Sequence, residues 1–408
     1  MKKRILKEYA KLIVNVGANV QKGQEVNIVA ELEQADFVVM LVEAAYKRKA
    51  KRVTIDWVDD RLTLLNNKYQ KVETLGEVLD WQKAKFEHQV KVLPVKIYIE
   101  SSDPDGEKGI DQKKRAQATK LRFPIVKPYI DKMEDRYQWV IAAAAGTTWA
   151  KKLFPELTKA QAKEKLWNEI LKASRAIDGN PLKNWADHNR RLHEHATHLN
   201  SLNLVELRYK ASNGTDFKVG LIPSARFLAG GETTIGGTFF NPNIPTEECF
   251  TTPMKGKAEG IVYASKPLSY NGEVIDKFWI RFKDGKATEF GAEQNEELLK
   301  EMLNMDETSG FLGEVALVPK ESPINKAGIL FFNTLFDENA SCHVALGRGF
   351  NMVVPGFDKM TLEEIKAKGV NDSLIHVDFM IGTDDLEITG IRADGSKVAV
   401  FKHGTWAF

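Results

Sequence analysis

Two polar residues, His376 and Asp378, stand two positions apart in an otherwise apolar segment, Ile375-His-Val-Asp-Phe-Met-Ile381. The alternation predicts a β-strand on which the imidazole and the carboxylate share one face. Polar groups on a buried strand need a partner, because unpaired polar burial is costly. A divalent metal would supply one, since neutral histidine and ionised aspartate are both good ligands. A hydrogen-bonded pair in the core, or a strand at a sheet edge, explains the same two residues.

Four further acids and imidazoles in the C-terminal half could join such a site. Glu247 and Glu248 lie in a Pro-rich segment that we interpret as a turn with exposed backbone, Glu314 begins an apolar strand, and His343 has small apolar neighbours. Each alone is weak evidence, because a glutamate at a strand end is more often solvated and a histidine among apolar residues is more often part of a core. Even if only one of the adjacent Glu247 and Glu248 is counted, three carboxylates and two imidazoles together exceed what a structural zinc needs. They suit a two-metal hydrolytic centre with a bridging carboxylate and open positions for water.

Three other patterns resemble functional motifs, but we interpret each of them as having no catalytic or ligand-binding role. His193-Glu-His-Ala-Thr-His198 resembles the helical zinc-protease motif, but that motif needs histidine where Thr197 stands, so we interpret the segment as a solvated helix face. Gly347-Arg-Gly349 lacks the third glycine and the following helix of a dinucleotide fingerprint. Cys249 and Cys342 neighbour the candidate ligands, and we interpret them as small buried residues lining the site rather than as thiolate ligands or a nucleophile.

The segments that would position these residues show two different secondary-structure patterns along the chain. Up to about residue 150, short β-branched runs alternate with helical periodicity, which favours a parallel sheet covered by helices, a doubly wound α/β domain. The expected strands cover 25–30, 52–57, 92–99 and 139–143, and the expected helices cover 35–49, 61–65, 74–88 and a short stretch from 148. Residues 158–200 read as helices broken at Gly179-Asn-Pro181, where turn chemistry is strong.

From residue 204 onward, short strand candidates separated by Gly, Asn and Pro predict a β-rich α+β domain. They cover 205–209, 217–220, 260–264, 274–282, 313–318, 329–332, 375–381, 386–392 and 398–402, with one helix over 295–303. We therefore predict an N-terminal α/β domain over 1–180, a helical junction to about 200, and a metal-binding catalytic domain over 201–408.

The composition excludes some partners and compartments. The formal net charge of +2 arises from nearly balanced acids and bases, so no electrostatic argument favours nucleic acid. The longest apolar run, Trp139 to Ala145, is far shorter than the ~20 residues that span a bilayer. Two cysteines cannot form a disulfide framework and fit a reducing compartment. We expect a cytoplasmic protein with neither a nucleic-acid nor a membrane partner.

Four segments occur in the order of the metal-site motifs of the aminopeptidase T family, the thermophilic metallopeptidases that include the aminopeptidase S and PepS proteins. They are Asn243-Ile-Pro-Thr-Glu-Glu248, Gly313-Glu314, His343-Val-Ala-Leu-Gly347 and His376-Val-Asp-Phe-Met-Ile-Gly382. The chain resembles this family over nearly its whole length. The resemblance implies metal ligands at Glu248, Glu314, His343, His376 and Asp378. It also implies removal of N-terminal residues from peptides, two divalent metals per chain, and a homodimer.

Within that resemblance, a carboxylate must take a proton from the attacking water, and Glu247 is our candidate, with a solvated or supporting role as the alternative. Phe350 departs from the family, which commonly has tyrosine seven residues after the third-motif histidine. Carboxylate and imidazole ligands accept Zn²⁺, Co²⁺, Mn²⁺ and, less well, Mg²⁺. Two alternatives remain: another two-metal amidohydrolase, such as a deacetylase, or a metal-binding or peptide-binding homologue with weakened catalysis, which Phe350 would favour.

Overall fold

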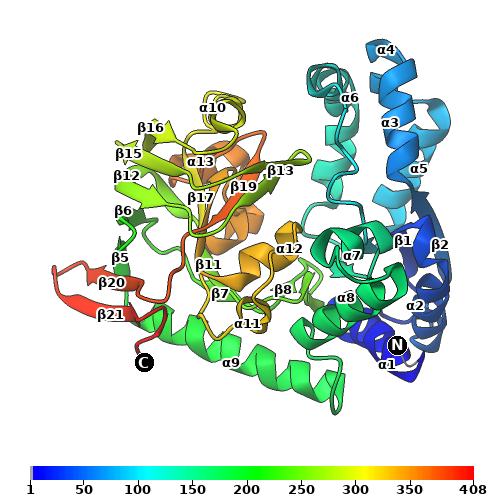
Figure 1. Ribbon diagram of the computed structural model, residues 1–408, viewed down its shortest axis with the longest axis horizontal. Coiled ribbons are helices and arrows are strands. Elements are labelled where there is room, and N and C mark those ends of the chain that lie inside the picture. Colours follow the sequence, from blue (N-terminus) through cyan, green and yellow to red (C-terminus); the bar gives the residue numbers. More distant parts are fainter. Residues whose placement is uncertain (1–2) are drawn as a thin grey trace. The chain divides into compact units, whose positions relative to one another are not determined.

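The computed structural model describes residues 3–408, whose backbone contacts divide the chain into two compact units (Figure 1). The first unit runs to Trp185 and also contains Gly231–Ile244, and the second contains Ala186–Gly230 and Pro245–Phe408. The predicted catalytic domain includes residues 231–244, but these return to the first unit because the strand Asn243–Ile244 pairs with Trp139–Ala143. All candidate site residues belong to the second unit.

The first unit contains a five-stranded sheet in the order β10-β4-β3-β1-β2, and every pairing in it is parallel. Its strands are β1 (Glu25–Glu31), β2 (Arg52–Val58), β3 (Val95–Glu100), β4 (Trp139–Ala143) and β10 (Asn243–Ile244). Parallel strands need crossover connections, which helices provide here. The predicted α/β class of this region is confirmed, and the four strands expected before residue 150 are all present.

The helices of the first unit follow local signals in the sequence. A capping box between Thr158 and Gln161 begins α8, and the Asn180 side-chain oxygen accepts hydrogen bonds at the start of α9. The helices are α1 (Lys3–Leu12), α2 (Ala35–Lys47), α3 (Asp60–Tyr69), α4 (Val72–Gly76), α5 (Asp80–Val92), α6 (Gln112–Met133), α7 (Thr147–Leu153), α8 (Lys159–Ala173) and α9 (Pro181–Ser201), whose residues from Ala186 onward belong to the second unit. No helix among residues 3–408 has both the length and the apolar composition that crossing a bilayer requires.

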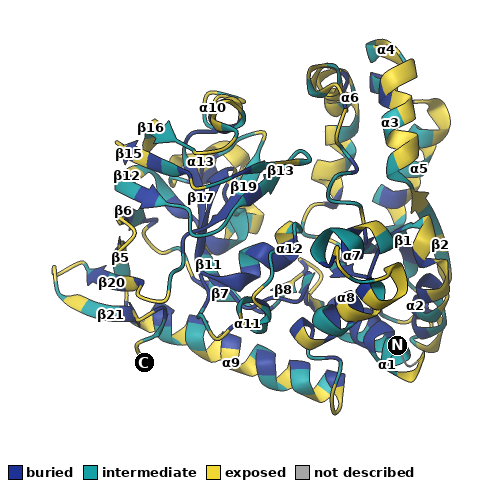
Figure 2. Ribbon diagram, viewed as in Figure 1, coloured by how far each residue is buried: buried dark blue, intermediate teal, exposed yellow. Residues whose placement is uncertain are grey.

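The sequence does not predict α6, which is the longest helix among the described residues. Pro124 and Pro128 lie inside it, and proline normally interrupts a helical pattern because it lacks the backbone N–H. Ala118 and Met133 are its only buried residues, so no apolar stripe marks it in the sequence. Figure 2 shows α6 with exposed and intermediate residues over most of its surface.

The second unit is built from two larger antiparallel sheets. One has the order β19-β18-β17-β11-β7, and the other has the order β16-β15-β12-β6-β5-β20-β21-β22. The strands of the first are β7 (Leu228–Ala229), β11 (Cys249–Thr251), β17 (Leu312–Leu317), β18 (His343–Gly347) and β19 (His376–Met380). Those of the second are β5 (Leu204–Lys210), β6 (Asp216–Leu221), β12 (Pro253–Tyr263), β15 (Trp279–Lys283), β16 (Lys286–Gly291), β20 (Glu387–Arg392), β21 (Lys397–Lys402) and β22 (Thr405–Trp406).

A single apolar core joins these two sheets. Alternate residues of the five-stranded sheet enter it, as Val315, Val344 and Phe379 do, and they pack with residues of the eight-stranded sheet such as Phe217 and Ile280. Because side chains alternate along a strand, the intervening residues of β17, β18 and β19 face the opposite side of the sheet. The predicted β-rich class is therefore confirmed, and one face of the five-stranded sheet remains for chemistry.

Two strand predictions in this unit are wrong. Residues 274–282 form two strands, β14 (Glu273–Ile275) and β15, because the chain turns at Lys277, which has a φ of 49°. Residues 329–332 form no strand; Phe332 has a φ of 54°, and the Asp337 carboxylate accepts hydrogen bonds from Phe331 N and Asn333 N. These carboxylate contacts hold the segment as a loop before the short helix α12 (Thr334–Asp337).

The remaining elements of this unit are short. They include α10 (Glu296–Leu303), α11 (Pro323–Ala327), the 3₁₀ turn Glu338–Ala340, α13 (Leu362–Ala367) and the small hairpin of β13 (Leu268–Tyr270) with β14. The predicted helix over 295–303 is confirmed by α10, which begins one residue later.

Candidate metal centre

The five candidate ligands come from four neighbouring strands of the five-stranded sheet. Glu248 immediately precedes β11, Glu314 lies in β17, His343 begins β18, and His376 and Asp378 lie in β19. Because these strands are adjacent in the order β19-β18-β17-β11, segments separated by up to about 130 residues of sequence come together. Figure 1 shows β17, β19 and β11 grouped in the second unit.

The strand register places the polar side chains on one face. Glu314 pairs with Ala345, and Ala345 pairs with Asp378, so these three residues form a row across the sheet. His343 and His376 lie two residues from that row on their own strands and therefore share its face. Ala345, which lies between Glu314 and Asp378 in this row, has only a methyl side chain.

The side-chain atoms converge into two groups that share one glutamate. Glu248, Glu314 and His343 form the first group and Glu314, His376 and Asp378 the second, with the ligand atoms of each group within 4.8 Å of one another. His343 Nε2 lies 3.2 Å from Glu248 Oε2, and His376 Nε2 lies 3.2 Å from Glu314 Oε2 and 3.4 Å from Asp378 Oδ1. Two such groups joined by one carboxylate match the pattern of a two-metal site with a bridging ligand.

Backbone carbonyls orient both imidazoles. His343 Nδ1 lies 3.2 Å from Ser341 O, and His376 Nδ1 lies 2.7 Å from Arg348 O. A carbonyl can only accept, so each neutral ring carries its proton on Nδ1 and donates it there. The Nε2 lone pairs then face the carboxylates, which is the arrangement of metal-ligating histidines whose other nitrogen is held by a hydrogen bond.

The charges of the cluster are unbalanced in the absence of a cation. Burial, with the nearby charges of Asp378 and Glu248, raises the pKa of Glu314 to about 7, although a hydrogen bond from His376 opposes this. Burial lowers the pKa of His343, but its hydrogen bond and charge interaction with Glu248 and the charges of Asp378 and Glu314 outweigh burial and raise that pKa to about 10. Each shift keeps a proton in the cluster that offsets the carboxylate charges.

One buried oxygen of the cluster shows most directly that the site fits a cation. Asp378 Oδ1 is shielded from solvent and has no hydrogen-bond partner among residues 3–408. Its pKa is lowered from the ordinary value; burial opposes this, and the charges of His376 and His343 cause it. The nearest imidazole nitrogens, His376 Nε2 at 3.4 Å and His343 Nε2 at 4.0 Å, do not hydrogen-bond this buried oxygen, so a cation held between these groups would supply the partner that it lacks. Oxygen and imidazole ligands in this number are the donors that Zn²⁺, Co²⁺ and Mn²⁺ accept.

Glu247 lies beside the cluster but faces another partner. Its backbone N–H donates to Asn339 Oδ1 at 2.7 Å, and its Oε1 lies 4.0 Å from His188 Nε2. The prediction that this turn is exposed is wrong, because Thr246, Glu247 and Glu248 are all buried. His188, which donates to Thr246 O at 2.7 Å, covers the segment from α9.

The sequence reasoning missed Glu338, in the 3₁₀ turn Glu338–Ala340. Loss of solvent around its carboxyl group and the charges of Asp378 and Glu248 raise its pKa well above the ordinary value, although His343 opposes this. Its Oε1 accepts a hydrogen bond from Asn339 Nδ2 at 3.3 Å. An acid five residues before His343 was the available signal, but nothing in the spacing alone separated it from the neighbouring Asp337.

Phe350 lies directly against one candidate ligand. Its ring centroid is 4.9 Å from that of His376 and 5.2 Å from that of Phe250, and its backbone N–H donates to Thr252 Oγ1 at 2.8 Å. The ring therefore packs on the imidazole of His376 and offers it no hydrogen bond.

The patterns set aside in the sequence lie outside the two ligand groups. His195 stacks on Trp406 with a centroid distance of 4.7 Å, and His198 packs on Phe408, so part of the predicted solvated helix face instead holds the C-terminal residues. Cys249 and Cys342 are both buried, and burial raises the pKa of Cys342 to about 12. Neither thiol has the thiolate character of a ligand or a nucleophile.

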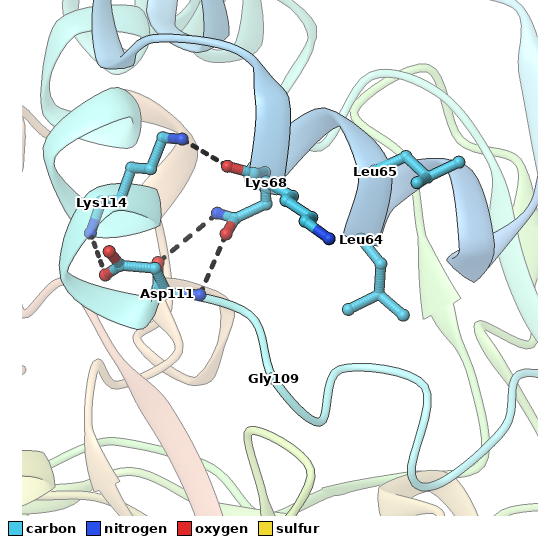
Figure 3. Close-up of a pocket in the computed structure, with 7 residues that line it drawn as sticks. Leu64, Leu65, Lys68, Gly109, Asp111 and Lys114 are labelled. Atoms are coloured by element: carbon cyan, nitrogen blue, oxygen red, sulfur yellow. Dashed lines mark hydrogen bonds between the residues drawn. The ribbon is translucent and has the colours of Figure 1, made fainter.

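A pocket in the first unit offers no competing site. It has a volume of about 340 Å³ and is lined by residues that include Leu64, Lys68 and Lys114 (Figure 3). Asp111 N–H donates to Asn67 Oδ1 at 2.9 Å, so these two polar groups already satisfy each other. Both candidate ligand groups found among the described residues lie in the second unit.

Comparison with known proteins identifies the family. A family model described as thermophilic metalloprotease (M29) matches residues 2–406. The chain belongs to this M29 family. Aminopeptidase AmpS of Bacillus subtilis (strain 168) is 41% identical over 404 residues, covering 99% of this chain and 98% of that protein. Aminopeptidase PepS of Streptococcus thermophilus is 39% identical over 406 residues, with the same coverage.

The fold agrees with this M29 assignment. The solved structure of wild-type AmpT from Thermus thermophilus matches with a TM-score of 0.90 at 36% identity and covers 100% of both chains. The predicted family, fold class and activity, a metal-dependent aminopeptidase, are therefore confirmed. The identity of the ligands remains a prediction, which the convergence of the five side chains supports.

Proposed function

We propose that this M29 aminopeptidase binds two divalent metal ions, one at Glu248, Glu314 and His343 and one at Glu314, His376 and Asp378. The observation that carries the proposal is that Glu314 belongs to both groups. It is 4% exposed, in the middle of a strand whose other residues are all buried, so its carboxylate has few partners besides these ligands. We propose Zn²⁺, Co²⁺ or Mn²⁺ as the ions, with Mg²⁺ as the weakest fit to two imidazoles.

When bound, a pair of such ions lowers the pKa of a shared water and polarises a scissile carbonyl. The chain's own contribution is to hold the two imidazoles with Nε2 facing the carboxylates and to shield the cluster from solvent on the core side. Three carboxylates that hold two divalent ions have no excess negative charge, so recognition of a free α-amino group would come from a carboxylate outside the ligand groups or from one of the ions.

Two carboxylates compete for the role of moving the proton from water to the leaving amine. Glu247 is the candidate from the sequence, but its carboxylate faces His188 at 4.0 Å. Glu338 is not in either ligand group, and its carboxyl group interacts with the charges of Asp378, Glu248, His343 and Glu314. A general base must be ionised and must reach the reacting water. Bound cations would offset the charges of Asp378 and Glu248 that help raise the pKa of Glu338, so we favour Glu338 and retain Glu247 as the alternative.

Phe350 supports a slower enzyme rather than a different one. A phenol at this position could donate a hydrogen bond to a tetrahedral intermediate, and a donor of that kind is worth roughly 2.7–4 kcal/mol in the transition state. The Phe350 ring lies on His376 and has no such donor. We also propose a cytoplasmic homodimer, as the scarce cysteines and the family resemblance imply.

Metal analysis combined with an aminopeptidase assay tests the proposal. We expect about two ions per chain and cleavage of an aminoacyl-nitroanilide that chelation abolishes and added metal restores. The N-acetylated form of the same substrate is the matched control, and it should not be cleaved. Cleavage that persists in metal-free protein would refute the two-metal mechanism, and preferred cleavage of the acetylated substrate would indicate a different amidohydrolase.

Matched glutamine variants distinguish the two proton carriers. Glu338→Gln should lower kcat by at least ~10² without loss of metal, since general base catalysis contributes typically 10²–10⁴-fold. Glu247→Gln should retain most of kcat if its role is to pack beside His188. A large loss of kcat in Glu247→Gln with little loss in Glu338→Gln would instead identify Glu247 as the general base.

A further inference from the structure

The backbone carbonyl of Arg348 is the acceptor that orients His376, at 2.7 Å from Nδ1. It belongs to the segment Gly347–Gly349, immediately after β18, and has no fixed position unless other groups hold that segment. What holds this carbonyl therefore also determines the direction in which His376 Nε2 points.

Asn371 binds the backbone on both sides of Arg348. Its side-chain Nδ2 donates to Gly347 O at 2.6 Å, and its backbone carbonyl accepts from Gly349 N at 2.8 Å. Arg348 N–H donates in turn to Ile375 O at 2.7 Å. Asn371 is 1% exposed, so these hydrogen bonds are shielded from water and costly to break.

Close packing leaves the Arg348 carbonyl little freedom. A Cβ on Gly313 would lie 2.2 Å from Arg348 O, and a Cβ on Gly347 would lie 2.1 Å from Ile375 O. Gly347 also has a φ of 96°, which side chains other than glycine rarely tolerate. The absence of a side chain at Gly313, next to the candidate ligand Glu314, is therefore what lets this carbonyl approach β17.

Asp306 braces the loop between Asn371 and His376. Its Oδ2 accepts from Ser373 Oγ at 2.6 Å and from Leu374 N at 2.7 Å. Asn371 Nδ2 reaches the same region by donating to Thr308 O at 2.9 Å. The loop that leads into β19 is thus held by one carboxylate and one amide, neither of which belongs to the ligand groups.

We propose that Asn371 is a positioning residue for one of the two metal sites, acting through the Arg348 carbonyl to hold His376 in its ligating orientation, with Asp306 as the brace of the same loop. The inference rests on the proposed function, since it needs His376 to be a ligand. It predicts that the two sites respond differently to a change at Asn371, because His343 is oriented by a separate acceptor, Ser341 O.

Titration of metal-free protein with Co²⁺ or Zn²⁺, followed by calorimetry, tests this without reference to activity. His376→Ala and His343→Ala first identify which binding step belongs to which site. Asn371→Ala should weaken the His376 step 10–100-fold, the usual cost of losing a hydrogen bond that supports a ligand, and change the other step by less than about threefold. Asp306→Asn, in a less buried position, should weaken the same step by up to about tenfold and provides the test if Asn371→Ala does not fold.

Asp385→Asn is the matched control, because Asp385 likewise accepts from a hydroxyl, Thr383 Oγ1, and from a backbone N–H, that of Ser212, away from the ligand groups. Both binding steps should be unchanged in it. Suppose that the wild-type protein shows two binding steps. If both steps are then unchanged in Asn371→Ala and Asp306→Asn, or if both weaken equally, the inference about Asn371 is wrong and the proposed function stands. A wild-type protein without two binding steps would overturn the proposed function, and the inference with it.

Discussion

In the metal-free protein, the free energy of unfolding should fall as the pH rises. The pKa shifts of the acids and imidazoles in the cluster determine this direction. The pKa of Glu314 is raised from 4.5 to about 7, so its contribution is fully present below about pH 4.5 and is lost as the pH rises through about 7. The pKa of His343 is raised from 6.5 to about 10, so its contribution is present below pH 6.5 and is lost as the pH rises through about 10. Asp378 has a lowered pKa and acts only at acidic pH, outside this window.

The size of the effect follows from the two shifts. Each pKa unit corresponds to about 1.36 kcal/mol, so between pH 6 and pH 9 Glu314 loses about 1 kcal/mol and His343 about 3 kcal/mol. The two groups share Glu248 and Asp378 as charged neighbours, so their contributions are not additive. We expect the free energy of unfolding of the metal-free protein to fall by about 2–4 kcal/mol over this range.

Urea unfolding at pH 6 and pH 9, with a chelator and with excess metal, measures this change. Because metal displaces protons from the same groups, metal affinity should increase with pH. The difference in unfolding free energy between the metal-bound and metal-free protein should therefore be larger at pH 9 than at pH 6. Glu314→Gln removes one of the titrating groups and should make the free energy of unfolding of the metal-free protein depend less steeply on pH. A metal-free protein that is equally or more stable at pH 9 would refute the electrostatic account of the cluster.

Three further predictions concern the surroundings of the site. Phe350→Tyr should raise kcat on an aminoacyl-nitroanilide by up to roughly 10²-fold with metal content unchanged; no gain would show that a phenol against His376 is not needed here. Cys249 and Cys342 should not react with a thiol reagent at pH 8 in the folded protein and should both react in guanidinium, because burial raises both pKa values; rapid labelling of the folded chain would contradict this. Phe379→Ala should cost about 3–5 kcal/mol of unfolding free energy and Phe379→Leu about 1 kcal/mol, since its ring is fully buried against Phe278; equal costs would show that the ring itself is not what the core needs.

Local chemistry made much of the fold predictable. The alternation around His376 and Asp378 predicted β19 and its polar face, because the period of a strand is determined by the backbone and not by its partners. The four apolar runs before residue 150 predicted four of the five parallel strands of the first unit; the two-residue strand β10 was not predicted. The break at Gly179-Asn-Pro181 predicted the start of α9, because turn residues act over a few positions.

Elements whose form depends on distant contacts were not predictable in this way. The proline-containing helix α6 has no apolar stripe, and the loop at residues 329–332 looks like a strand until the Asp337 carboxylate binds its N–H groups. Glu247 and Glu248 look exposed in sequence, and they are buried because β11 lies inside a sheet with α9 against it.

The sequence by itself determined which residues could bind metal: an inventory of carboxylates and imidazoles in apolar surroundings, which resemblance to a family ordered into a site. Only the tertiary structure decided that Glu314 belongs to both ligand groups, that Glu338 lies within the field of the cluster, and that Asn371 holds the carbonyl that orients His376. The physical reason is that strand pairing and side-chain hydrogen bonds join residues far apart in the chain, whereas spacing in a sequence reports only on neighbours along it.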